Sequence, residues 1–374
     1  MSSKTAPQKK IASGSSFGAF ASEEHARRAV QAAIKKIPGR RIGGVLLFLT
    51  TGYALYPQTA IRAAVKVSGT LNVTGCCALS VFTEQDSSTD REGAVAMAFS
   101  HESALSPLLS AEQRGTQIEL CLSLSSPNAG KIAIQSANIK QFGAIASDEF
   151  GEGPYSLWQG GRIVEREYCH NVFAGSGQYF LAKCESARPL SPLMQINRSD
   201  AHELIELGQR PALDSLNEWL PAQPQNSEQD LGLSIVALVP ETSDPESVNL
   251  GHHQLLHVVS IDKATRRVML SEPIKAGRRI LWAIRDPQYA EQQMRLSLLE
   301  AKRKFSGQPT FALMFSNINR GTDFYQGHNR DLRLFLEIFP DTVMVGISSH
   351  AEIIAGYRSN ASIHHSSTVF GLFS

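Results

Sequence analysis

The first 80 residues switch between helical and continuous apolar patterns. Ser22 can cap a helix whose apolar residues recur at helical spacing over 26–34. A continuous apolar run over 44–49 has the length of a strand and favours a strand buried on both faces. The pattern then predicts a helix over 57–67 and a second strand over 71–77. This strand–helix–strand order predicts an α/β layer with a crossover connection.

After about residue 94 the pattern changes to short apolar runs separated by Gly, Pro, Ser and Asn. A polar, Pro- and Gln-rich stretch over 222–230 predicts an exposed loop, and the pattern from Asp286 to about Lys304 predicts a long helix. Further apolar runs predict strands over 231–239, 311–315, 343–347 and 368–373.

These patterns together predict an α/β protein of two domains, each with a mixed sheet covered by helices. A Ser- and Gly-rich stretch leads us to expect a disordered tail over residues 1–20. We expect the first domain over 21–207 and the second over 208–374. A total length of 374 residues agrees with two domains, because single cores seldom grow to that size.

Composition narrows the class of protein. Lys and Arg total 36 against 35 acidic residues, so no large basic surplus exists to neutralise the phosphates of a nucleic acid. Apolar runs such as 45–49 are far shorter than a membrane-spanning helix, and no signal-peptide core follows the N-terminal lysines. Five cysteines, an odd number without a CxxC pair, agree with a reducing compartment. We therefore expect a cytoplasmic protein with neither a nucleic acid nor a membrane as partner.

Several short motifs are spread through both halves of the chain. They are 45–49, 73–76 and 158–163 in the first half, and 282–285, 311–315, Arg320 with Gly321, and 351–353 in the second. In this order the motifs resemble the FIST family (F-box intracellular signal transduction) over most of residues 40–373. The resemblance implies a FIST N-like domain at 21–207, a FIST C-like domain at 208–374, and a stand-alone small-ligand sensory protein. The chain departs from the family pattern at Asn317, where cysteine is usual, and at His350 in the closing turn.

Arg320 and Glu352 are the first candidates for ligand binding. Both follow apolar strands at the expected carboxyl ends, where open α/β sheets place ligands. An arginine fork suits a carboxylate and a glutamate can hold an ammonium, so the pair would suit an amino acid. The alternative is a structural ion pair between the two residues. The neighbouring motif turns add four ligand-binding candidates: Asn317, Gly321, Cys76 and Trp158.

Cys76 and several histidines are further candidates for a reactive or ligand-binding role. Cys76 would be a nucleophile only with a lowered pKa, and a buried free cysteine is the commoner case. We expect no cofactor, but some stand-alone FIST proteins are haem-containing nitric-oxide sensors. By that resemblance His257, in a cluster with His252 and His253, and His170 are the candidate haem ligands. Histidines without a ligand are the alternative.

The sequence has no HExxH motif and no Walker phosphate loop. We therefore expect a sensory protein rather than an enzyme. It would bind a small molecule, such as an amino acid, and signal by contact with a histidine kinase or another regulator. A haem-based nitric-oxide sensor and an adaptor without a ligand are the alternatives.

Overall fold

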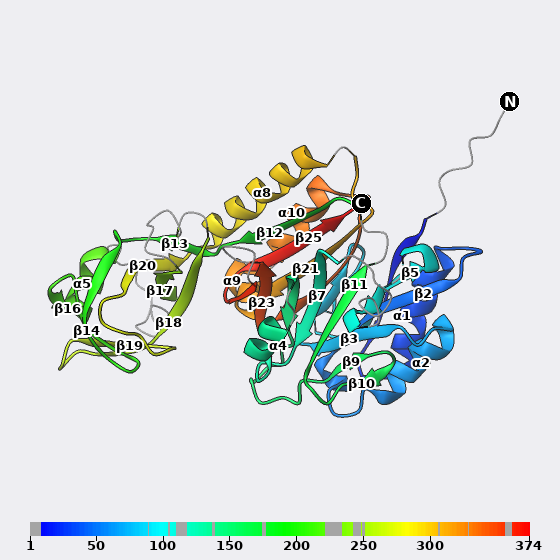
Figure 1. Cartoon of the computed structure of the whole chain (residues 1–374), viewed down its shortest axis with the longest axis horizontal. Helices are drawn as coiled ribbons and strands as arrows, with labels where there is room; N and C mark the ends of the chain where they lie inside the picture. Colours follow the sequence, from blue (N-terminus) through cyan, green and yellow to red (C-terminus); the bar gives the residue numbers. More distant parts are fainter. Residues whose placement is uncertain are drawn as a thin grey trace. The chain divides into compact units, whose positions relative to one another are not determined.

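The computed structural model describes residues 9–88, 90–103, 105–109, 118–136, 139–173, 177–220, 234–241, 248, 251–305, 307–327, 329–355 and 361–374. Two compact units make up the chain (Figure 1). Unit 1 contains Met1–Cys184 and Met294–Ser374, and unit 2 contains Glu185–Gln293. The expected loop over 222–230 lies outside the described residues.

The first sheet of unit 1 confirms the predicted α/β layer. Alternate side chains of strand β2, among them Leu46 and Phe48, pack into the largest core cluster, whereas Leu47 and Leu49 pack beneath helices α1 and α2. Burial on both faces explains why the strand reads as one continuous apolar run. Ser22 caps α1 as predicted, accepting a hydrogen bond from the backbone N–H of Glu24. The helices are α1 (Glu23–Lys35) and α2 (Gln58–Ser68), and the sheet order is β1 (Ile11–Gly18), β5 (Glu92–Ser100), β2 (Ile42–Thr50), β3 (Val73–Ala78), β9 (Leu157–Gln159) and β10 (Arg162–Ile163).

Residues 11–18, expected within a disordered tail, form strand β1 instead. This strand pairs antiparallel with β5 from Ile11–Phe99 to Gly18–Glu92. Its small residues allow α1 to lie close: a Cβ added at Gly14 would clash with the backbone carbonyl of Ala29 in α1. The Ser- and Gly-rich composition therefore reflects close packing of a helix on a strand rather than disorder.

Two further sheets complete unit 1. Among the strands that the structure describes in unit 1, three neighbouring pairs are parallel: β2 with β3, β7 with β8, and β21 with β22. The second sheet has the order β24 (Ala361–His364), β23 (Ala351–Ala355), β8 (Lys140–Ile145), β7 (Leu120–Ser125), β11 (Tyr168–Phe173) and β6 (Leu105–Pro107). The third has the order β12 (Tyr179–Cys184), β25 (Thr368–Phe373), β21 (Phe311–Asn317), β22 (Val343–Ser349) and β4 (Val81–Thr83).

The boundary expected at 207/208 does not divide these sheets. Strand β22, near the end of the chain, pairs with β4, and β23 pairs with β8. The last 81 residues therefore share their sheets with the first half of the chain, because strand pairing joins segments far apart in sequence. Among the described residues, unit 1 also contains the helices α4 (Gly130–Ser136), α9 (Thr322–Tyr325) and α10 (Arg330–Ile338) and the short 3₁₀ turns η1 (Thr51–Tyr53), η2 (His101–Ser103) and η3 (Ile318–Arg320).

Helix α8 (Pro287–Lys304) confirms the predicted long helix and contributes Met294, Leu298 and Ala301 to a core cluster of unit 1. No helix in the described part of the chain is long and apolar enough to cross a membrane.

Unit 2 is an antiparallel sheet that closes on itself, because strand β20 pairs with β14 and also with β17. Trp282 lies fully buried in its core, against which helix α5 (Ala212–Trp219) packs Leu216. The strand order is β13 (Ala187–Pro189), β20 (Arg279–Arg285), β14 (Met194–Asp200), β15 (Glu203–Leu207), β19 (Arg267–Leu270), β18 (His253–Asp262) and β17 (Ile235–Pro240), with β16 (Arg210–Pro211) on β15.

Gly143 in β8 tests the close packing of the second sheet. A Cβ added there would clash with the backbone carbonyl of Ser123 in the adjacent strand β7, which cannot move without loosening the parallel ladder. We expect Gly143→Ala to lower the free energy of unfolding by about 3 kcal/mol in urea denaturation. The control Gly307→Ala, where the added Cβ meets open space, should change it by less than about 0.5 kcal/mol. Equal effects of both substitutions would contradict this packing.

Candidate functional site

The carboxyl ends of the parallel strand pairs meet in unit 1. The backbone N–H of Ser348, near the end of β22, donates to the carbonyl of Ser80 after β3 (2.8 Å). The N–H of His350 donates to the carbonyl of Ile145 at the end of β8 (2.9 Å). The N–H of Leu79 donates to Ser147 Oγ (3.0 Å). We call residues 79–80, 146–156 and 348–350 the carboxyl edge, where ligand sites of α/β sheets are usually found.

Arg320 does not contact Glu352, so the two residues do not form the structural ion pair that the sequence left open. Its fork is filled by Asp331, with Nε 3.0 Å from Oδ2 and Nη2 2.7 Å from Oδ1. Nη1 donates to the carbonyl of Cys184 and Nη2 also donates to Tyr325 Oη. Arg320 and Asp331 are both fully buried. The arginine therefore stabilises the interior and does not present its fork to a ligand carboxylate.

The Arg320–Asp331 pair is satisfied on all sides. Burial by itself would lower the pKa of Arg320, but the Asp331 carboxylate reverses this and holds the pKa above its usual value. Asp331 also accepts hydrogen bonds from Tyr325 Oη (2.8 Å) and Thr368 Oγ1 (2.8 Å). Removal of one partner from a buried ion pair of this kind leaves an uncompensated charge and strongly destabilises the folded protein.

Glu352 lies in a second buried polar cluster. Its carboxyl group accepts hydrogen bonds from Ser349 Oγ (2.8 Å), Ser367 Oγ (2.7 Å) and Asn317 Nδ2 (3.2 Å). Burial raises the pKa of Glu352 to about 8, although these three donors act in the opposite direction. Ser316 and Asn317 are neighbours on β21, so their side chains point to opposite faces of the sheet. Ser316 Oγ donates to Asp331 on one face, and Asn317 Nδ2 donates to Glu352 on the other.

Three other candidate residues lie in the backbone or the interior of unit 1. Gly321 lies in extended backbone just before α9. Cys76 is fully buried in β3, and burial raises the pKa of its thiol well above the usual value, which disfavours a nucleophilic role. Trp158 is fully buried on β9, where it pairs with Gly75 of β3. None of these side chains lines the cavity described below.

The two histidines considered as haem ligands lie in different units. His170 in unit 1 is buried, its Nδ1 lies 2.9 Å from Ser123 Oγ, and burial lowers its pKa to about 4. His257 is in β18 of unit 2. Neither lines the cavity, and the described residues hold no group of three His, Cys, Asp or Glu side chains that could bind a metal ion.

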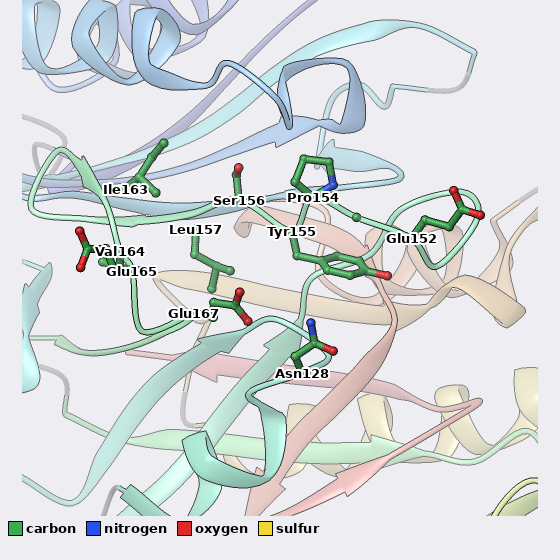
Figure 2. A pocket seen from close by; sticks show the side chains of 11 residues that line it. Asn128, Glu152, Pro154, Tyr155, Ser156, Leu157, Ile163, Val164, Glu165 and Glu167 are labelled. Atoms are coloured by element: carbon green, nitrogen blue, oxygen red, sulfur yellow. The ribbon is translucent and has the colours of Figure 1, made fainter.

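A cavity of about 320 Å³ opens beside the carboxyl edge (Figure 2). The turn 152–157 forms one wall, and Asn128 and the segment 163–167 contribute the rest. Figure 2 shows Leu157 between Val164 and Tyr155, with Glu167 and Asn128 below. None of the candidate residues from the sequence lines this cavity. The acidic, Gly-containing stretch from Asp148 to Gly153 was the available signal, and it is visible only in hindsight because such stretches are common in exposed loops.

Asp148 holds the wall of the cavity in place. Its carboxylate accepts the backbone N–H groups of Gly151 (2.8 Å), Glu152 (3.0 Å) and Gly153 (2.7 Å), and the hydroxyl of Tyr155 (3.1 Å). Burial alone would raise the pKa of Asp148, but these donors hold it below its usual value. Gly151 and Gly153 have φ of 75° and 80°, a conformation that favours glycine. The turn is therefore organised around one ionised carboxylate.

Glu152, Glu165 and Glu167 give the cavity a negative charge, and its lining includes no Lys or Arg. All three glutamates are exposed, and Glu167 is held by Ser126, whose Oγ donates to Oε2 (2.7 Å). A cavity of this size can admit a small molecule. Its charge favours a ligand that carries an ammonium or guanidinium group.

Comparisons with known proteins leave the family open. No protein-family model matches the chain. Two proteins of Mycobacterium tuberculosis, from strains CDC 1551 and H37Rv, are each 23% identical to it over 180 residues, and both are described as uncharacterized. The match covers 47% of this chain and 46% of each relative, so the aligned stretch spans less than half of each relative's length.

Arg320→Ala tests the structural role of the buried ion pair. Removal of the guanidinium leaves Asp331 buried without its cation, and we expect the free energy of unfolding to fall by about 3–5 kcal/mol in urea denaturation. Arg295→Ala is the control, because Arg295 pairs with Glu337 at the surface of the same unit and should cost less than about 1 kcal/mol. Stability of Arg320→Ala within 1 kcal/mol of the wild type would contradict the assignment.

Glu352→Gln tests the buried carboxylic acid. The folded pKa of about 8 lies above the ordinary value of 4.5, so the folded state holds this proton more tightly than the unfolded state does. The contribution to stability is complete below about pH 4.5 and is lost as pH rises through about 8, at roughly 1.4 kcal/mol per pH unit at most. We expect Glu352→Gln to remove this fall in the free energy of unfolding between pH 5 and about 8. Exposed Glu300→Gln is the control, and an unchanged slope in Glu352→Gln would refute the protonated state.

Proposed function

We propose that this protein is a small-ligand sensory protein rather than an enzyme, and that its ligand carries a positive charge. The observation that supports this most directly is the cavity beside the carboxyl edge, with three glutamates and no basic residue in its lining. The order of motifs that resembles the FIST family supports a sensory role independently of the cavity. The five cysteines, an odd number and all buried, agree with a cytoplasmic location.

The charge of the cavity narrows the class of ligand. An amine, or a cationic amino acid such as arginine or lysine, gains from the carboxylates of Glu152, Glu165 and Glu167. The carboxylate of an amino acid finds no arginine here, because the fork of Arg320 is taken by Asp331. We therefore expect agmatine, which is arginine without the carboxylate, to bind more tightly than arginine, and glutamate not to bind.

The position of the cavity provides a route for signalling. Asp148 organises the turn that forms the cavity wall, and Ser147 next to it donates to the carbonyl of Ser348. A ligand that rigidifies this turn would also restrain the turn after β22. Contact between the carboxyl edge and a protein regulator, such as a histidine kinase, would then report that the cavity is occupied.

Calorimetric titration with agmatine, arginine and glutamate tests the proposal. We expect the double variant Glu152→Gln/Glu165→Gln to bind agmatine about tenfold more weakly, because each exposed carboxylate contributes up to about 1 kcal/mol. Exposed Glu300→Gln serves as the matched control. Mass spectrometry of the mixture should recover agmatine unchanged. Equal binding of glutamate would refute the cationic ligand, and conversion of agmatine would refute the sensory role in favour of an enzyme.

A further inference from the structure

The four most exposed large apolar side chains of the described residues all lie on loops at strand carboxyl ends in unit 1. They are Phe20 (82% exposed), Tyr56 (81%), Phe150 (78%) and Leu55 (71%). Phe20 follows β1, Leu55 and Tyr56 follow β2, and Phe150 follows β8. Strands β1 and β2 both run antiparallel to β5, so their carboxyl ends lie at the same edge of the sheet.

Hydrogen bonds join these loops to one another. Tyr53 Oη, in the turn after β2, donates to the carbonyl of Ser22 (2.7 Å) in the turn after β1. Ser156 Oγ donates to the carbonyl of Ala54 (2.6 Å), which attaches the turn after β2 to the loop 147–156. The N–H of Leu79 donates to Ser147 Oγ (3.0 Å) at the other end of that loop. The members of this surface, which we call the edge patch, are Phe20, Leu55, Tyr56, Leu79 and Phe150.

The loops of the edge patch carry only negative charge. Residues 19–22, 51–57, 79–80 and 147–156 contain Asp148, Glu149 and Glu152 but neither Lys nor Arg. Glu149 and Glu152 are exposed on either side of Phe150, and Glu152 also lines the cavity. Aromatic side chains exposed together beside acidic groups mark a surface for a partner that offers apolar contacts and positive charge.

We propose that the edge patch docks a basic amphipathic segment of a partner protein. An anionic membrane surface would be repelled by Glu149 and Glu152, and a second copy of the chain would bring like charges together across a twofold axis. A segment with leucines on one face and lysines on its flanks matches both the exposed aromatic side chains and the carboxylates. This inference deepens the contact step of the proposed function, but it does not require the cavity to bind a ligand.

The probe is a fluorescent helical peptide of about 18 residues, with leucine on one face and lysine on the other, and its binding to the full chain is measured by anisotropy. We expect the triple variant Phe20→Ser/Tyr56→Ser/Phe150→Ser to bind at least about tenfold more weakly than the wild type. The variant Glu149→Gln/Glu152→Gln should lose most of the dependence on salt. Leu71→Ser is the matched control, because Leu71 is 68% exposed but precedes β3 at the opposite end of the strand.

Each other outcome counts against the proposal. Equal weakening by Leu71→Ser, or equal binding of a peptide with glutamate in place of lysine, would overturn the assigned surface or its charge. Binding of anionic vesicles without binding of the peptide would assign the patch to a membrane. Concentration-dependent dimers of the wild type that disappear in the triple variant would assign it to a second copy. Agmatine titration of the triple variant separates the two proposals, since loss of peptide binding with unchanged agmatine binding concerns the edge patch alone.

Discussion

The ion pair between Arg320 and Asp331 is the interaction on which the interior of unit 1 depends. The guanidinium reaches the end of β12 through the carbonyl of Cys184, and the carboxylate accepts from Thr368 of β25 and Tyr325 of α9. One pair of opposite charges therefore ties helix α10 and the turn after β21 to a buried sheet. Because every partner is internal, the guanidinium of Arg320 is out of contact with solvent, whereas the cavity lies at the edge of the sheets.

The carboxyl edge owes its form to the parallel strand pairs. Turns after β3, β8 and β22 come from widely separated parts of the chain, and backbone hydrogen bonds hold them together. The loop 147–156 belongs to both functional proposals: Asp148 orders the wall of the cavity, and Phe150 of the same loop stands exposed in the edge patch. Occupancy of the cavity and docking at the patch would act on one loop, which gives a sensory protein a short path from ligand to partner.

The buried polar clusters on the two faces of β21 differ in how their carboxyl groups are stabilised. On one face a full charge is cancelled by its counter-charge, as Arg320 and Asp331 show. On the other face Glu352 has hydroxyl and amide partners but no cation in hydrogen-bond contact, and its raised pKa keeps the carboxyl group neutral near pH 7. The alternation of side chains along the strand keeps the two clusters apart, although Ser316 and Asn317 are adjacent in sequence.

Local patterns alone predicted the helix capped by Ser22, the strand buried on both faces at 44–49, the long helix that became α8, and the α/β class. These features depend on neighbours within a few residues, so they can be read from periodicity. Tertiary structure decided the rest: residues 11–18 became a strand because β5 offers an edge, and the last 81 residues joined the first half because β22 pairs with β4. In the folded chain Arg320 also pairs with Asp331 rather than Glu352, and the cavity is lined by segments that contain none of the candidate residues. Charge partners and cavities depend on distances between residues remote along the chain, which no local pattern contains.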